Sequence, residues 1–124
     1  MVGKVCIDSD VLINFLRKDR NAVEIMGSFQ GDMYTTVINT FELWYGKKKQ
    51  VGVKELIERI NVLPLEKQSS LLAAEMMEKL KEKGEIIDLK DVIIAAICIH
   101  SSMPLLTLNK KHFERMQQFG LQLT

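Results

Sequence analysis

Acidic side chains stand in three separate segments of this 124-residue chain, each next to apolar residues. Asp8 follows a run rich in β-branched residues (2–7), Glu42 lies among aromatic and aliphatic residues, and Asp91 precedes the apolar run 92–99. A buried carboxylate is costly unless a hydrogen bond or a cation compensates its charge. Sites made only of oxygen ligands suit Mg²⁺ or Mn²⁺, and such metals assist phosphodiester hydrolysis. As a set, the acids predict a divalent-metal site for phosphoryl chemistry.

Each of these acids also has an ordinary structural explanation. Asp8 or Asp10 could cap the helix that follows, because Asp is among the best N-cap residues. Glu42 could be an exposed residue of an amphipathic helix, although its apolar neighbours weigh against that. Asp88 could cap the next helix, with Asp91 in the first turn, where the helix dipole favours an acid. We favour Asp88 as the cap and Asp91 as a site carboxylate.

Strands that alternate with helices are expected to bring the acids together. Apolar and β-branched runs predict strands at 2–7, 33–37, 62–65 and 104–108, with a short one at 121–123. Helical spacing of apolar residues predicts helices at 10–17, 22–29, 39–48, 53–60, 69–83, 88–101 and 110–117. This alternation predicts an α/β fold with a mostly parallel sheet between helices. Ligands of such folds bind beyond the carboxyl ends of the strands, where Asp8 stands.

The composition limits the class of protein. Apolar residues make up 47% of the chain, which excludes intrinsic disorder, and the length suits a single domain spanning 1–124. The 17 Lys+Arg and 16 Asp+Glu give a net charge of +1, which argues against a protein that holds nucleic acid only by being basic. We therefore expect any nucleic-acid binding to depend on a metal, because a bound divalent cation inverts the charge of an acidic pocket.

The remaining sequence signals concern the cysteines and the cell compartment. Cys6 and Cys98 each lie in an apolar run, which predicts two buried hydrophobic side chains and no disulfide or metal pair. Asp8 interrupts any hydrophobic leader. The apolar run 92–99 is far shorter than the roughly 20 residues that cross a bilayer. We expect a soluble, cytoplasmic protein with no membrane partner.

Four segments together resemble the PIN-domain family, and most closely its single-domain VapC-type toxins. They are CIDSDVLI (6–13), TVINTFELWYG (36–46), DVIIAAI (91–97) and LTLNKKHF (106–113). Each is a weak signal alone, but four in this order over nearly the whole chain are specific. The resemblance implies a three-layer α/β/α sandwich with a central, mostly parallel sheet and a ribonuclease site that depends on Mg²⁺ or Mn²⁺. It also implies a homodimer that a small VapB-like antitoxin neutralises.

The resemblance assigns roles to particular residues. It makes Asp8, Glu42 and Asp91 the metal ligands, with Glu42 completing the site or positioning the attacking water. Asn109 joins the catalytic set as a hydrogen-bond partner of that water or of the substrate phosphate. The supporting polar residues that would line the pocket are Asp10, Thr36 and Thr107.

The closing segment departs from the family's usual pattern. Asn109 and His112 occupy the two places where many members have a fourth acid. This leaves open whether the site holds one metal or recruits a second one together with the RNA phosphate. By its sequence surroundings alone, His112 is expected in a surface turn or helix.

The sequence therefore predicts a metal-dependent endoribonuclease that hydrolyses RNA phosphodiesters, as the toxin of a VapBC-type toxin–antitoxin pair. A degenerate PIN domain that only binds is the first alternative. A phosphatase of the haloacid-dehalogenase type also opens with a strand and Asp-x-Asp, but it would give Glu42 no role. Several lysines serve either RNA contact or solubility, and the sequence favours neither: Lys47, Lys48, Lys49, Lys110 and Lys111.

Overall fold

A computed structural model describes residues 3–45 and 51–124 of the chain. Its strands form one parallel sheet in the order β3-β2-β1-β4, so that β1 is an interior strand. The elements, in chain order, are β1 (Lys4–Ile7), α1 (Ser9–Leu16), α2 (Arg20–Ser28), β2 (Asp32–Thr36), α3 (Val37–Trp44), α4 (Val53–Arg59), β3 (Asn61–Leu63), α5 (Lys67–Glu82), α6 (Leu89–His100), β4 (Leu105–Leu106), α7 (Lys110–Glu114) and the 3₁₀ helix η1 (Arg115–Phe119).

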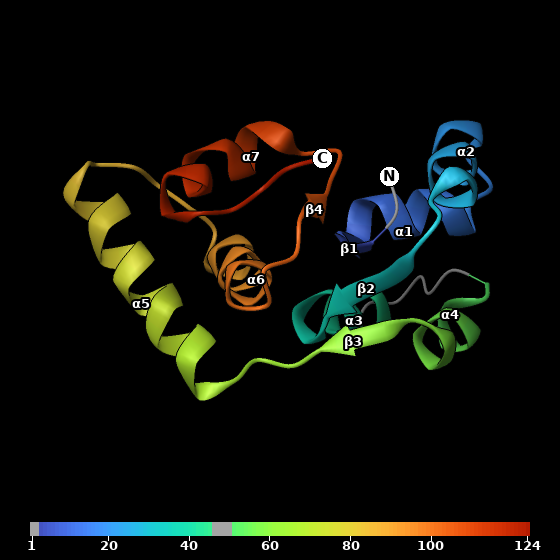
Figure 1. Cartoon of the computed structure of the whole chain (residues 1–124), viewed down its shortest axis with the longest axis horizontal. Coiled ribbons are helices and arrows are strands. Elements are labelled where there is room, and N and C mark those ends of the chain that lie inside the picture. Colours follow the sequence, from blue (N-terminus) through green and yellow to red (C-terminus); the bar gives the residue numbers. More distant parts are fainter. Residues whose placement is uncertain (1–2, 46–50) are drawn as a thin grey trace.

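Helices cover both faces of the sheet, which confirms the predicted α/β/α sandwich. Figure 1 shows α5, α6 and α7 on one side of the strands and α1, α2 and α4 on the other. Successive side chains of β1 point to opposite faces, as a strand requires. Cys6 packs with Met76 and Leu80 of α5 in one core, whereas Val5 and Ile7 belong to the other.

Helix caps explain where the helices begin. Asp8 caps α1 by accepting from the Ser9 backbone N–H, and Asp88 caps α6 by accepting from the Lys90 N–H. Side-chain caps of this kind satisfy backbone N–H groups that have no partner inside the helix. Asp88 therefore has the capping role predicted for it, and Asp8 caps a helix whatever else it does.

Several elements are shorter than the sequence predicts. Helix α3 stops at Trp44 because the Tyr45 backbone is extended (φ −80°, ψ 125°), and Lys47–Lys49 lie outside the described residues. Strand β3 ends at Leu63 because Pro64 has no N–H to donate. The predicted strand at 104–108 is only Leu105–Leu106, and that at 121–123 is a single bridge from Leu123 to Leu105.

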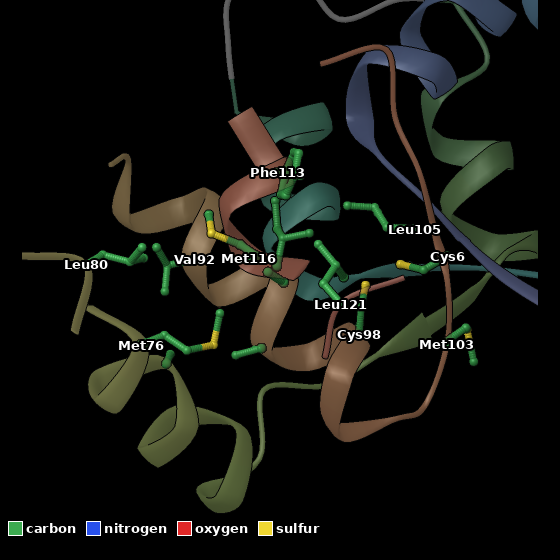
Figure 2. Packing of buried hydrophobic residues seen from close by; sticks show 14 residues of the cluster. Cys6, Met76, Leu80, Val92, Cys98, Met103, Leu105, Phe113, Met116 and Leu121 are labelled. Atoms are coloured by element: carbon green, nitrogen blue, oxygen red, sulfur yellow. The ribbon is translucent and has the colours of Figure 1, made fainter. Parts of the chain in front are cut away.

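The two cysteines are buried and not joined to each other, as predicted. Figure 2 shows Cys6 of β1 and Cys98 of α6 side by side in the core between the sheet and the helices α5 to α7. Across residues 3–45 and 51–124, every helix is too short or too polar to cross a membrane.

A buried hydroxyl fixes the end of the central strand. Thr35 of β2 is fully buried, and its Oγ1 donates to the Ile7 carbonyl at 2.7 Å. This bond joins β1 to β2 one residue before Asp8, so the position of the Asp8 backbone depends on it.

We expect Thr35→Val to lower the free energy of unfolding by about 1–2 kcal/mol, because it removes a buried hydrogen bond without changing the side-chain shape. Urea unfolding of the parent and the variant measures the effect. Thr40→Val is the matched control, since Thr40 Oγ1 donates within its own helix, to the Val37 carbonyl. Equal losses in the two variants would contradict the role given to Thr35.

Candidate active site

Asp8 lies at the carboxyl end of the interior strand β1 and is only 7% exposed. Its backbone N–H donates to the Leu106 carbonyl at 2.9 Å, which extends the pairing of β1 with β4. Oδ1 accepts from the Ser9 backbone N–H at 2.9 Å and from Asn39 Nδ2 at 2.8 Å. Oδ2 accepts from Thr107 Oγ1 at 2.8 Å. Both carboxylate oxygens are thus held in place from different segments of the chain.

The surroundings of Asp8 disfavour its charge despite these bonds. Burial, assisted by the neighbouring Asp10 carboxylate, raises the pKa of Asp8 from 3.8 to about 6. The hydrogen bonds from Thr107 and the Ser9 backbone act in the opposite direction, and Glu42 adds a further upward contribution to the pKa. A cation placed beside Asp8 would stabilise the ionised form.

Asn39 is the residue that connects Asp8 to the next helix. It is fully buried, and its Nδ2 donates both to Asp8 Oδ1 and to Ser9 Oγ, each at 2.8 Å. Its Oδ1 accepts from Thr36 Oγ1 at 2.8 Å, and Thr36 Oγ1 accepts in turn from the Asn39 N–H at 3.2 Å. Thr36 therefore reaches the predicted site only by orienting Asn39, within the capping box of α3.

Glu42 lies one turn after Asn39 and is partly buried, so it is not an ordinary surface Glu. Its Oε1 accepts from Ser9 Oγ at 2.8 Å. Its Oε2 lies 3.5 Å from Lys90 Nζ of α6. A continuous series of hydrogen bonds therefore runs from Asp8 through Asn39 and Ser9 to Glu42. Glu42 also forms an ion pair with α6, the helix that carries Asp91.

Thr107 connects Asp8 with Asp10. Its hydroxyl faces Asp8 Oδ2 at 2.8 Å and Asp10 Oδ2 at 3.3 Å, and it accepts from the Asn109 backbone N–H at 3.0 Å. Asp10 Oδ2 also accepts from the Leu108 N–H at 3.1 Å. These bonds bend the chain just after β4 towards the start of α1, which explains why that strand is short.

Asp91 occupies the first turn of α6 and is half-buried, with its Oδ2 3.6 Å from His112 Nδ1 of α7. Burial and the nearby Asp88 raise the pKa of Asp91, and Glu42 adds to this, whereas His112 lowers it. Glu42 thus influences the charge of Asp91 as well as that of Asp8, which places Glu42 within electrostatic reach of both other acids. His112 is exposed at the surface, as expected, but it is also paired with this acid.

The oxygen donors fit Mg²⁺ or Mn²⁺ in their chemistry, and the raised pKa values show carboxylates held where a cation is favourable. Within the described residues, no three His, Cys, Asp or Glu side chains are already arranged around a metal position. Glu42 and Asp91 each face a basic side chain instead. Metal binding by this set requires those two acids to change partners.

The other predicted site residues lie further out. Asn109 is exposed at the start of α7 and makes no side-chain cap bond to that helix. Its backbone N–H contacts the Asp8 network by donating to Thr107 Oγ1. Lys110 and Lys111 follow it as exposed residues of α7. Lys47–Lys49 lie outside the described residues.

Three polar residues of this network were not predicted from the sequence. Asn39 had a readable signal, because it follows Thr36 by three residues, which is the capping-box spacing. Ser9 stands between two acids, and its sequence surroundings do not indicate a role for its hydroxyl. Lys90 reads as an ordinary solvent-exposed lysine, and its contact with Glu42 exists only in the folded chain.

Comparison with known proteins identifies the family to which this chain belongs. The sequence model of the PIN domain matches residues 5–118. Ribonuclease VapC1 of Methanocaldococcus jannaschii is 33% identical over 123 residues, which is 98% of this chain and 87% of that protein. The structure of VapBC-1 from nontypeable Haemophilus influenzae superposes with a TM-score of 0.80 at 25% identity, covering 100% of this chain and 97% of that one. The structure of VapBC2 from Rickettsia felis, bound to a promoter DNA fragment, superposes with a TM-score of 0.78 at 23% identity, covering 100% of this chain and 98% of that one.

The chain belongs to the PIN domain family, and its similarity to VapC-type proteins extends over nearly its whole length. This membership separates it from the haloacid-dehalogenase-like phosphatases considered above.

The raised pKa of Asp8 predicts a pH-dependent stability in metal-free buffer. Native Asp8 holds its proton up to about pH 6, whereas the unfolded chain releases it near 3.8. This contribution to stability is complete below the unfolded pKa and is lost as the pH rises through the native pKa. Asp8→Asn keeps the shape and can satisfy the same three partners. As the pH rises from 4 to 7.5, we expect the free energy of unfolding of the variant to increase by on the order of 2 kcal/mol relative to that of the parent.

Urea unfolding at each pH, with a chelator present, measures the difference. Asp19→Asn is the control, since Asp19 is an exposed cap carboxylate at α2. A gain that is the same at pH 4 and pH 7.5 would show that burial does not disfavour the Asp8 charge.

Proposed function

We propose that the chain is a metal-dependent endoribonuclease and the toxin of a VapBC-type toxin–antitoxin pair. The observation that carries the proposal is the buried Asp8 carboxylate, oriented on both oxygens at the end of the central strand, with Glu42 in electrostatic reach of both Asp8 and Asp91. The PIN family membership and the relative named Ribonuclease VapC1 support RNA as the substrate.

Asp8, Glu42 and Asp91 would hold the Mg²⁺ or Mn²⁺ ion. When bound, such a cation supplies Lewis-acid stabilisation of the negative charge that develops on the phosphate. The chain's own residues hold the carboxylates in place: Asn39 and Thr107 fix the two oxygens of Asp8, and Ser9 fixes Glu42 Oε1. Outer hydrogen bonds of this kind orient metal ligands and are costly to remove.

The two oxygens of Glu42 have different roles in this proposal. Oε1 is occupied by the Ser9 hydroxyl, so Oε2 is the oxygen that serves as ligand or accepts a hydrogen bond from the attacking water. Asn109 contributes its amide to the water or to the phosphate by a rotation of its exposed side chain. Lys110 and Lys111 follow it on α7 and extend the contact with the RNA backbone, together with Lys47, Lys48 and Lys49.

We expect Asp91→Asn and Asp8→Asn each to lower the rate of RNA cleavage by about 100-fold or more in Mg²⁺ or Mn²⁺, because each removes one charged ligand oxygen. Gel analysis of a labelled RNA, with tRNA and rRNA as the first substrates, measures the rate. Asp88→Asn is the matched control on the same helix, because Asn can also cap α6 and the change removes only a carboxylate outside the proposed ligand set. An Asp91→Asn variant that cleaves as fast as the parent refutes the site.

The alternative is a degenerate PIN domain that binds without cleaving. The specific observation in its favour is that a His, His112, stands beside Asp91 where many members have a fourth acid. Calorimetric titration with Mn²⁺ separates the two functions, since a module that only binds other molecules takes up no metal at these acids.

The aromatic surface of α3 supports the proposal that two copies of the chain associate. Phe41 is 56% exposed and Tyr45 is 74% exposed, and their rings stack at 5.2 Å. Beside them lies a groove of about 440 Å³ that includes Ile57 of α4. Exposed aromatic side chains are enriched in protein interfaces. We place the homodimer contact here; the solved VapBC complexes support a small VapB-like antitoxin as the second partner.

The double substitution Phe41→Ala with Tyr45→Ser is expected to shift the chain from dimer to monomer at micromolar concentration, since it removes the exposed stacked pair. Gel filtration at two concentrations measures the shift. Leu71→Ser, which removes an equally exposed apolar side chain from α5, should leave the dimer intact. A parent that is monomeric at both concentrations contradicts the assignment.

A further inference from the structure

We propose that Lys90 is an internal counter-ion of the site, one that must leave Glu42 before that carboxylate can bind a divalent cation. The inference rests on the proposed function, because it assumes that Glu42 is a metal ligand. It concerns a residue that belongs to this chain's own pocket and that neither the acid pattern nor the family match singles out.

The ion pair between Lys90 and Glu42 involves the Glu42 oxygen that does not accept the Ser9 hydrogen bond. Ser9 Oγ occupies Oε1 at 2.8 Å, and Lys90 Nζ lies 3.5 Å from Oε2. A divalent cation and the Lys90 ammonium would therefore compete for the same oxygen, Glu42 Oε2. Because Ser9 is in turn held by Asn39, Glu42 cannot swing freely to present another oxygen.

Lys90 stands at a position that does not favour a cation. It is the second residue of α6, where its own N–H donates to the Asp88 cap. A positive charge in the first turn of a helix opposes the helix dipole. The helix therefore gives no reason for a lysine here, whereas the Glu42 carboxylate across the α3–α6 contact does.

The exposure of Lys90 makes the pairing reversible. Its side chain is 49% exposed, so it can leave Glu42 for water at little cost. An exposed or half-exposed ion pair is weak and sensitive to salt. A divalent cation held by Asp8 and Asp91 would outcompete such a partner. Lys90 thus makes the site less negative and lowers its affinity for metal without blocking it.

Calorimetric titration with Mn²⁺ at low salt tests the competition without using activity. Lys90→Met keeps the aliphatic stem and removes the charge, and we expect it to bind Mn²⁺ about two- to fivefold more tightly than the parent. Lys90→Arg should restore the parental affinity. Lys67→Met is the matched control, because Lys67 also stands in the first turn of a helix, the exposed start of α5.

A double-mutant cycle tests the pair itself in metal-free protein. Urea unfolding of Lys90→Met, Glu42→Gln and the double variant, with a chelator present, should show a coupling of about two- to fivefold in the unfolding equilibrium constant. No coupling would show that the pair does not form, and the proposal would be wrong.

The two measurements distinguish the possible failures. Coupling with equal Mn²⁺ affinity in Lys90→Met and the parent overturns the competition but leaves the proposed metal site standing. Coupling with no Mn²⁺ binding by any variant removes the metal site, and with it both the metal dependence of the proposed function and the role of Lys90.

Discussion

The structure of the site depends on the burial of the Asp8 carboxylate at the end of the central strand. A buried carboxylate is costly, and it is retained only where donors are supplied by the surrounding fold. Here the donors come from α1, α3 and the segment after β4, so that the first and last thirds of the chain meet at one side chain. The Thr107 hydroxyl lies 99 residues away in sequence. The same contacts that compensate burial therefore also fix where each neighbouring acid can lie.

This constraint explains why the residues buried around Asp8 are polar but uncharged. Asn39 can donate to Asp8 and accept from Thr36 at once, which neither a carboxylate nor a lysine could do. The network satisfies the carboxylate without neutralising it, and so the pKa of Asp8 stays raised. A Lys or Arg at the same place would have stabilised the charge and occupied the position that a metal needs. The observed arrangement holds the ligand in place and leaves its charge available.

The fold could be predicted from apolar periodicity because that signal is repeated over many residues, as in α5 and α6. The ends of elements could not, since they depend on single contacts such as the one that bends Thr107 towards Asp8. The acids of the site stood out because their neighbours are apolar. Ser9 and Lys90 did not, because their roles arise only when α1 and α6 pack against α3. The single domain over 1–124 and the roles of the individual site residues stay predictions.

The charge of the whole chain, +1, acquires a local meaning from these contacts. Two of the three proposed ligands face a basic side chain of the same chain, Glu42 facing Lys90 and Asp91 facing His112. The pocket is therefore less repulsive to an approaching phosphate than three bare carboxylates would be, even without metal. A bound cation is expected from the sequence to invert the charge of the site, and these basic side chains of the protein act in the same direction to a smaller extent. The basic partners of Glu42 and Asp91 thus reduce the negative charge of the site without cancelling it, because the hydrogen-bond partners of Asp8 are uncharged donors.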